Sequence, residues 1–178
     1  TQTAMSVLPI GTANDFARCA LSTCEIDRLL TLMPHPQIRK IDTIAIDDQI
    51  SLNITSLGFD TKVQRKALQI NARCRWLGSF AYPLAIVLSL FGNRQYAIRY
   101  RVNAIGPDGS PQAVEGQANM ILAAVCNGRY YGGGYNPAPD AKLDDGRLFF
   151  CLVDNLPLQR ILKLIPRYKR SEARRVGK

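Results

Sequence analysis

The stretch Ala118–Cys126, with the sequence ANMILAAVC, decides the fold because it is an apolar run of strand length. Such a run is expected of a strand that is buried on both of its faces. A second strand is predicted at Leu148–Val153, and a glycine-rich loop that begins at Asn127 connects the two. The centre of the protein is therefore predicted to be a sheet.

Alternating and helical patterns precede this run. Apolar residues occupy every second position of Ile44–Ile46 and Ile50–Ile54, around the turn Asp47-Asp48-Gln49, which predicts a hairpin. Gly58 interrupts the second strand near its end. Two helices, one further strand and a tight turn are then predicted, at Lys62–Ala72, Trp76–Leu90, Tyr96–Ala104 and Gly106–Gly109.

The beginning of the chain has a different pattern. Met5–Pro9 is predicted to be a buried strand that ends at Gly11, and a helix follows at about Asp15–Leu21. A second helix is predicted at Glu25–Met33, where Pro34-His35-Pro36 ends it.

The periodicity changes from helical to strand-like near Ile41, and this change sets the predicted domain organisation. We predict an α+β fold that is mainly β, in which residues 41–178 form a two-layer antiparallel β-sandwich with helical insertions. Residues 1–40 are predicted to be a strand-helix remnant of another domain, of α/β type. A short helix is predicted at Leu158–Ile165, after Pro157.

Composition excludes several classes of protein. With 47% hydrophobic residues the chain of 178 residues can bury a core, so disorder is not expected. No apolar run reaches the ~18–20 residues of a spanning helix. The nearest, Phe80–Phe91, is interpreted as a buried helix, with a membrane-facing helix as the alternative. The five cysteines form no CxxC pair and are odd in number, so neither a zinc site nor a disulfide framework is expected. This use of cysteine predicts a cytoplasmic protein.

The net charge of +9 is concentrated at the end of the chain. Residues 159–178 contain eight basic residues and a single acid, Glu172. Such a segment can contact nucleic acid, anionic lipid or only water. Tyr168 is the only aromatic residue there, whereas proteins that bind single strands interleave several, so nucleic acid is not an expected partner.

The segment LPIGTANDFA, residues 8–17, is the first candidate for chemistry. A strand followed by a glycine turn and a helix start presents unpaired N–H groups and the positive end of a helix dipole, which favours phosphate. Thr12 adds a hydroxyl donor, and Asn14 or Asp15 can cap the helix by accepting a backbone N–H. The alternative is an ordinary strand–helix crossover without a ligand.

The loop NGRYYGGGYNPAPDAKLDDG, residues 127–146, is the second candidate. Its three consecutive glycines predict positive φ angles or a close approach to the backbone. Asp140, Asp144 and Asp145 then gather hard oxygen ligands on a tight loop, which suits Mg²⁺ or Ca²⁺. The alternative is a solvated acidic turn whose side chains bond to their own backbone.

Four segments together resemble a known family. LPIGTANDFAR, LNITSLGFD, WLGSFAYPLA and VCNGRYYGGGYNPAPDAKLDDGRLFFCLV occur in the order found in the diacylglycerol kinase family, which has sphingosine and ceramide kinases as relatives. The resemblance covers nearly the whole chain, from Val7 to Arg167. It implies an N-terminal α/β domain that binds ATP, a C-terminal β-sandwich that carries much of the lipid site, and an active site between them.

The resemblance also implies roles for single residues. Thr12 matches a position that contacts ATP, and Asn14 is assigned with it to the nucleotide site. Residues 1–40 would then be a remnant of the ATP-binding domain. Asp60 falls near a position that touches the lipid head group in sphingosine kinases.

The LDDG segment resembles the structural Mg²⁺ site of the family. Asp145 would ligate the ion through its side chain, helped by the backbone carbonyls of Lys142 and Arg147. Mg²⁺ or Ca²⁺ is therefore the expected metal, and ATP the expected co-substrate.

Two motifs of the family are absent from the chain, the GGDGT loop that binds ATP and the DGE motif that supplies the catalytic acid. Phosphoryl transfer needs positioned phosphates, Mg²⁺ and a base. We therefore expect a fragment, itself inactive and without a catalytic residue, of a kinase that phosphorylates the hydroxyl of diacylglycerol or a related lipid. The alternative is a non-enzymatic lipid-binding or regulatory module.

A lipid substrate stays in the bilayer, so the kinase is expected to work at the inner face of the membrane. The basic end from Arg160 to Lys178 is predicted to contribute to that attraction.

Overall fold

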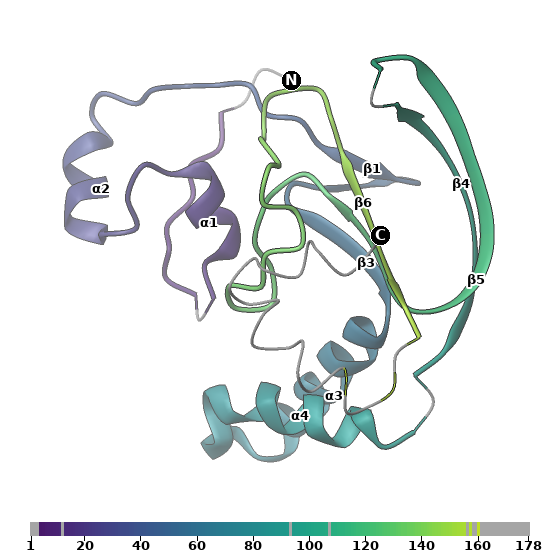
Figure 1. The fold of residues 1–178 in the computed structure, drawn as a ribbon. Coiled ribbons are helices and arrows are strands. Elements are labelled where there is room, and N and C mark those ends of the chain that lie inside the picture. Colours follow the sequence, from purple (N-terminus) through teal and green to yellow (C-terminus); the bar gives the residue numbers. More distant parts are fainter. Residues whose placement is uncertain are drawn as a thin grey trace. The chain divides into compact units, whose positions relative to one another are not determined.

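The computed structural model describes residues 4–11, 13–92, 94–106, 108–155, 157 and 160. The chain divides into two compact units, and Figure 1 traces it through both. Unit 1 comprises Thr1–Thr55, Ala124–Cys151 and Gln159–Lys178, and unit 2 comprises Ser56–Ala123 and Leu152–Leu158. Antiparallel strand pairs alternate with helices along the sequence, which confirms the predicted α+β, mainly β class.

A two-stranded sheet forms the predicted hairpin of unit 1. It pairs β1 (Ile44–Ile46) with β2 (Gln49–Ser51) in antiparallel register, with Ile46 opposite Gln49. Asp47 takes the left-handed conformation that the tight turn requires, with φ at 51°. The second half of the expected strand is a separate element, because Ile54 begins β3 in the other sheet.

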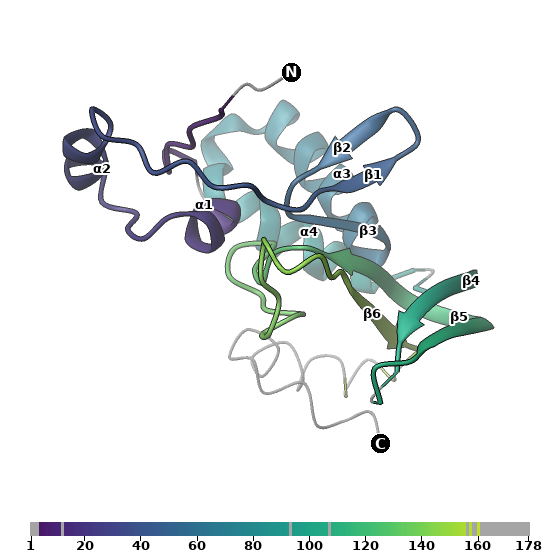
Figure 2. The same ribbon diagram turned by 90° about the horizontal axis from the view of Figure 1, so that it is seen from above.

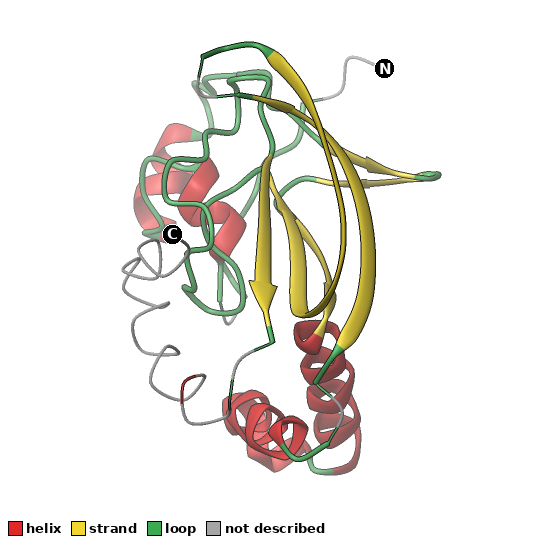
Figure 3. Cartoon of the chain, turned by 45° about the vertical axis from the view of Figure 1, so that its right-hand side comes forward, coloured by secondary structure: helices red, strands yellow, loops and turns green. Residues whose placement is uncertain are grey.

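The larger sheet has four strands, shown in yellow in Figure 3. Its order is β3-β5-β4, and β6 also pairs with β5. The long pair is antiparallel, running from Tyr96 opposite Met120 to Ile105 opposite Pro111. The bounds of the four strands are Ile54–Gly58 for β3, Tyr96–Ile105 for β4, Pro111–Cys126 for β5 and Phe149–Asp154 for β6.

The second half of β5 is the buried centre that the apolar run predicts. Residues 120–124 and Cys126 are buried, whereas most of the strand before Met120 is exposed. In unit 1, Ala124 and Cys126 pack with Ala138 and Ala141 of the following loop. Burial, with a smaller contribution from nearby Cys151, raises the pKa of Cys126 to about 12, so its thiol stays neutral.

The helices differ between the units (Figure 2). Unit 1 has two short ones, α1 (Asp15–Ala20) and α2 (Ile26–Leu32), close to the predicted bounds. Unit 2 has α3 (Phe59–Arg73), the 3₁₀ helix η1 (Arg75–Phe80) and α4 (Ala81–Leu90). The helices α3 and α4 pack through Val63, Ala67 and Ala85, whose small or branched side chains let the two backbones approach.

Two local expectations are wrong. The apolar segment Met5–Pro9 forms no strand, because no strand of the described chain pairs with it, and Met5 and Leu8 are exposed. The single helix expected at Trp76–Leu90 is broken at Gly78, whose φ of 48° and ψ of −123° are not helical.

Three other expectations concern the organisation of the chain or its end. The helix expected at Leu158–Ile165 and the basic end lie outside the described residues, except for Arg160. The domain boundary expected near residue 40 stays a prediction.

Candidate functional site

The turn before α1 is built by the side chain of Asn14. Its Oδ1 accepts a hydrogen bond from the Gly11 N–H at 2.8 Å, and its Nδ2 donates to the Pro9 carbonyl at 2.9 Å. Asn14 itself has a φ of 54°, a left-handed conformation that asparagine tolerates better than most residues. The amide therefore closes the turn backward, and the expected forward cap of α1 by its side chain is wrong.

Asp15 fastens this turn to the glycine-rich loop. Its side chain is buried, and its Oδ2 accepts a hydrogen bond from the Gly133 N–H at 2.8 Å. Arg18, one turn along α1, lies 3.9 Å from the other oxygen, Oδ1. The two candidate segments, 118 residues apart in sequence at this contact, thus meet in unit 1.

The glycine-rich loop is a small hairpin. Tyr131 and Tyr135 exchange two backbone hydrogen bonds of 2.9 Å, and the three glycines between them have φ angles of 60°, 86° and 100°. The predicted positive φ angles are therefore confirmed. Because glycine enters this region without a steric penalty, the loop can turn tightly enough to present the Gly133 N–H to Asp15.

Two buried asparagines hold the start of this loop. Asn127 is fully buried, and its Nδ2 donates to the carbonyls of Asp42 at 2.6 Å and Leu52 at 2.9 Å. Asn53 contacts the same loop, since its Nδ2 donates to the Tyr130 carbonyl at 2.8 Å. These bonds join the LNITS and VCNGRY segments, which the sequence places far apart.

Asp42 links the same cluster to the LDDG loop. Its backbone N–H donates to the Leu143 carbonyl at 2.6 Å, and its Oδ2 accepts from the Gly146 N–H at 2.7 Å. Asp145 Oδ1 accepts from the Arg147 N–H at 3.1 Å, as in a turn that an aspartate closes on its own backbone. The Asp145 bond is the kind expected of an acidic turn that satisfies its own backbone, and the Asp42 bonds tie this turn to a distant segment.

The predicted metal ligands suit a hard cation. No group of three acidic, histidine or cysteine side chains that could hold a metal occurs in the described residues. Asp42 accepts the Gly146 N–H with one carboxylate oxygen, and Asp145 accepts the Arg147 N–H with one of its own. The other oxygen of each carboxylate accepts no hydrogen bond within the described chain. Carboxylate oxygens beside backbone carbonyls are the donor set that Mg²⁺ and Ca²⁺ take.

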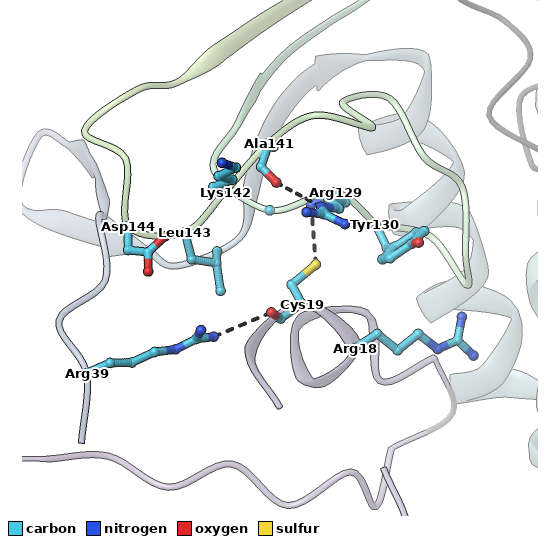
Figure 4. Close-up of a pocket in the computed structure, with 10 residues that line it drawn as sticks. Arg18, Cys19, Arg39, Arg129, Tyr130, Ala141, Lys142, Leu143 and Asp144 are labelled. Carbon is cyan, nitrogen blue, oxygen red and sulfur yellow. Dashed lines mark hydrogen bonds between the residues drawn. The ribbon is translucent and has the colours of Figure 1, made fainter. Parts of the chain in front are cut away.

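A pocket of about 240 Å³ opens between these segments of unit 1 (Figure 4). Four segments line it: α1, the stretch before β1, the start of the glycine-rich loop and the LDDG loop. Its charged side chains are four cations and one carboxylate. The lining residues are Arg18, Cys19, Arg39, Gly128, Arg129, Tyr130, Ala141, Lys142, Leu143 and Asp144.

Two of the arginines are fixed by the backbone. Arg39 donates from Nη2 to the Ala20 carbonyl at 2.7 Å, which places a cation at the C-terminus of α1, where the helix dipole is negative. Arg129 donates from Nε to the Ala141 carbonyl at 2.8 Å, and its backbone N–H points to Cys19 Sγ at 3.3 Å. Figure 4 shows the Arg39 side chain pointing toward Cys19, and Arg129 bonded to the Ala141 carbonyl.

The other two cations are available to a ligand. Lys142 is exposed and makes no hydrogen bond or ion pair with other described residues, and Arg18 has only the long contact with Asp15. Four positive side chains and the one carboxylate of Asp144 line the cavity, so its lining has an excess of positive charge that favours anions. The pocket is therefore suited to phosphate groups.

The predicted site residues are only partly gathered here. Asn14 and the loop of Lys142, Asp145 and Arg147 belong to unit 1, whereas Thr12 lies outside the described residues. Asp60 belongs to unit 2, in the first turn of α3, where its Oδ1 accepts from the Thr61 N–H at 2.8 Å.

Sequence reasoning missed the residues that connect the site, above all Asp15, Asp42 and Asn127. Each is a polar residue whose partner comes from a distant segment, so spacing along the chain carries no sign of the contact. A weak signal existed for Asn127, because a polar residue directly after a buried apolar strand is costly to bury without partners.

Comparisons with known proteins agree on one family. Residues 53–173 match the model of the YegS C-terminal NAD kinase beta sandwich-like domain. A protein of Chromohalobacter salexigens named "Probable lipid kinase YegS-like" is 32% identical over 164 residues, which cover 92% of this chain and 49% of that protein. A protein of the same name from Pseudomonas putida is 34% identical over 151 residues, which cover 83% and 46%. The chain spans about half the length of these relatives.

Solved structures agree on the fold. The crystal structure of a diacylglycerol kinase from Bacillus anthracis superposes with a TM-score of 0.57 at 22% identity, covering 91% of this chain and 49% of that one.

Proposed function

We propose that this chain, which belongs to the YegS C-terminal NAD kinase beta sandwich-like domain family, is part of an ATP-dependent lipid kinase. Its curated relatives carry the name of lipid kinases, and a protein of the same fold is described as a diacylglycerol kinase. The kinase transfers the γ-phosphate of ATP to the hydroxyl of diacylglycerol or a related lipid. We assign the catalytic base to no residue of this chain.

The observation that carries this proposal is the cationic pocket of unit 1. The transferred phosphate and its neighbours are the most negative groups of the reaction, and guanidinium and ammonium groups are their usual protein partners. Arg39 and Arg129 are held in place by backbone carbonyls, so they add charge at fixed positions. Arg18 and Lys142 contact the phosphates of ATP directly in this proposal.

The turn at residues 9–15 forms the nucleotide side of the same site. Thr12 contacts ATP in this proposal, as the sequence resemblance implies. Asn14 acts through the turn, because both ends of its amide already bond to the backbone of Gly11 and Pro9. In this assignment Asn14 positions the turn, and residues 1–40 belong to the ATP-binding domain.

The LDDG loop holds Mg²⁺ or Ca²⁺ in this proposal. Asp145 supplies a carboxylate oxygen, and Lys142 and Arg147 supply backbone carbonyls. The carboxylate of Asp42, which accepts from the Gly146 N–H, is an additional donor in this proposal that sequence reasoning did not find. A divalent ion held by these oxygens would supply positive charge to the loop.

The lipid side of the proposal involves unit 2. Asp60 contacts the lipid head group, and the kinase works at the cytoplasmic face of a membrane, to which the basic end from Arg160 to Lys178 contributes attraction. No helix in the described ranges has both the length and the apolar character to cross a bilayer.

Transfer of radiolabelled phosphate from ATP to a panel of lipid alcohols, by the full-length protein, tests the proposal. We expect Arg18→Gln and Lys142→Gln to lower kcat/KM for ATP by about 10-fold or more each, because each removes a charged hydrogen bond to phosphate. Arg28→Gln is the matched control, since Arg28 is an exposed cation of α2 outside the pocket, and it should change kcat/KM less than about twofold.

The main alternative is a lipid-binding or regulatory module without chemistry. It predicts that the full-length protein binds lipid but labels none of the panel, with or without Mg²⁺. That result would reject the kinase. Labelling that is insensitive to Arg18→Gln and Lys142→Gln would instead reject the pocket as the phosphate site.

A further inference from the structure

The helical segment of unit 2 exposes several large apolar side chains, among them three aromatic rings. Trp76 is 84% exposed, Phe80 74% and Phe91 75%. The other exposed apolar residues of this segment are Leu68, Leu84, Val87 and Leu88. Exposed apolar residues occur singly on most proteins, but a group of this kind in one helical segment marks an interaction surface.

The exposed residues around α4 share one side of the helix. Phe80, Leu84, Val87, Leu88 and Phe91 follow one another at steps of three, four or one, which is the spacing of a single helical face. We call these five residues the outer face of α4.

The opposite side of α4 is the one that is packed. Ala81, Ala85, Ser89 and Leu90 are buried, and Ala85 contacts α3 through the cluster with Val63 and Ala67. The helix is therefore apolar on both sides although only one side packs within unit 2. A helix at the surface of a protein in water usually has a polar outer side. The segment Phe80–Phe91, interpreted from the sequence as a buried helix, is thus buried on one side of α4 only.

The two elements next to α4, α3 and η1, are mostly positive, since Asp60 of α3 is their one acidic residue. Residues 61–107 contain no aspartate or glutamate but eight basic residues. Five of these lie in the two elements next to α4, namely Lys62, Arg65, Lys66, Arg73 and Arg75. Arg75 directly precedes the exposed Trp76, and both Arg73 and Arg75 are exposed. An acidic protein partner or an anionic lipid surface complements such a border, and a neutral partner does not.

We propose that the outer face of α4, together with Trp76, docks onto the surface of an anionic lipid bilayer. The apolar side chains enter the boundary between head groups and acyl chains, Trp76 sits at the head-group level, and Arg73 and Arg75 meet the lipid phosphates. The inference deepens the proposed function and rests on it for its purpose, because a lipid kinase must meet a substrate that stays in the bilayer.

The length of α4 fits this mode of binding. Its ten residues extend for about 15 Å, roughly half of the ~30 Å hydrocarbon core. The helix is therefore too short to span and suited to lie at the interface. In this proposal a bilayer is preferred to an acidic protein groove, because exposed apolar residues also occur in the neighbouring elements, at Trp76 in η1 and Leu68 in α3.

Co-sedimentation of the full-length protein with vesicles tests the face directly. The vesicles contain phosphatidylcholine with or without about one third phosphatidylglycerol, at low and high salt. We expect the double variant Trp76→Ser/Phe80→Ser to weaken binding about 10-fold or more at both salt concentrations, since it removes apolar contact. Arg73→Gln/Arg75→Gln should weaken binding only to the anionic vesicles, and mainly at low salt.

The matched control is Ile50→Ser/Ile105→Ser. Ile50 is 70% exposed and Ile105 61%, fractions similar to the 74% of Phe80. Both lie on strands, outside the α3–α4 segment. Circular dichroism establishes that each variant is folded. Binding that falls equally in the control and in Trp76→Ser/Phe80→Ser would overturn the proposal, because any loss of exposed apolar area would then suffice.

A kinase assay separates this inference from the proposed function. If both hold, Trp76→Ser/Phe80→Ser loses activity on diacylglycerol in vesicles but keeps it on a short-chain, monomeric diacylglycerol. Loss of vesicle binding in a protein with no kinase activity supports the face and rejects the kinase. Sedimentation velocity tests whether a second copy of the chain occupies this face instead. If Trp76→Ser/Phe80→Ser abolishes a dimer and leaves vesicle binding unchanged, the face is an interface between two copies, and the proposal is wrong.

Discussion

Unit 1 has buried polar side chains that hold distant segments together, whereas the segment of η1 and α4 in unit 2 has exposed aromatic side chains. In unit 1, Asp15 and Asn127 are buried and bond to the backbone of distant segments. In unit 2, Trp76 is 84% exposed and Phe80 74%. Each region thus reverses the usual distribution of polar and apolar groups.

The difference shows that the fold depends on the buried polar groups and not on the exposed apolar ones. A buried amide that satisfies two carbonyls stabilises the folded state, because its removal leaves those carbonyls without water or a partner. An exposed aromatic ring has little to lose on unfolding, since it is already in water. We therefore expect the stability of the fold to fall when buried polar residues of unit 1 are replaced. It should change little when exposed apolar residues of unit 2 are replaced.

The largest effect is expected at Asn127. Asn127→Ala removes the hydrogen bonds to the partly buried carbonyls of Asp42 and Leu52, so the free energy of unfolding should fall by about 2 kcal/mol or more. Urea denaturation followed by circular dichroism measures it. Asn119→Ala, at an exposed position of β5, is the control and should change the free energy by less than about 0.5 kcal/mol. Equal effects at the two positions would contradict the assignment.

An intermediate effect is expected at Gly128. A Cβ at this position would overlap Oδ1 of Asn53, so Gly128→Ala should lower the free energy of unfolding by about 2 kcal/mol. If Asn53 is the obstacle, Gly128→Ala should be milder when Asn53→Ala is already present, by at least about 1 kcal/mol in a double-mutant cycle. Strict additivity of the two changes would show that the strain lies elsewhere.

The smallest effect on stability is expected at Trp76. Trp76→Ser removes a large side chain that is 84% exposed, so the free energy of unfolding should change by less than about 0.5 kcal/mol in the same urea experiment. A loss as large as that of Asn127→Ala would mean that Trp76 packs within the fold, and the contrast between the two units would then disappear.

Local patterns predicted much of the secondary structure. The alternation at Ile44–Ile46 and Tyr96–Ala104, and the apolar run at Ala118–Cys126, correspond to β1, β4 and the buried half of β5. These predictions succeed because side-chain periodicity directly reflects which faces are buried. Met5–Pro9 fails for the complementary reason, since an apolar segment becomes a strand only beside a partner that the pattern cannot name.

The candidate site was predictable only in its parts. The sequence predicted the positive φ angles of the three glycines, which are confirmed, and a metal-binding acidic loop, which stays a prediction. The pocket itself depends on Arg18, Arg39, Arg129 and Lys142, which come from four separate segments.

By itself, then, the sequence determined most strands, most helix positions and the family resemblance, because each rests on neighbouring residues and their order. Only the tertiary structure decided which cations line one cavity, which carboxylate holds the glycine-rich loop, and that α4 is apolar on a side that no described residue of unit 2 buries. The physical reason is that charge and hydrogen bonding act over a few ångströms in space, whatever the distance along the chain.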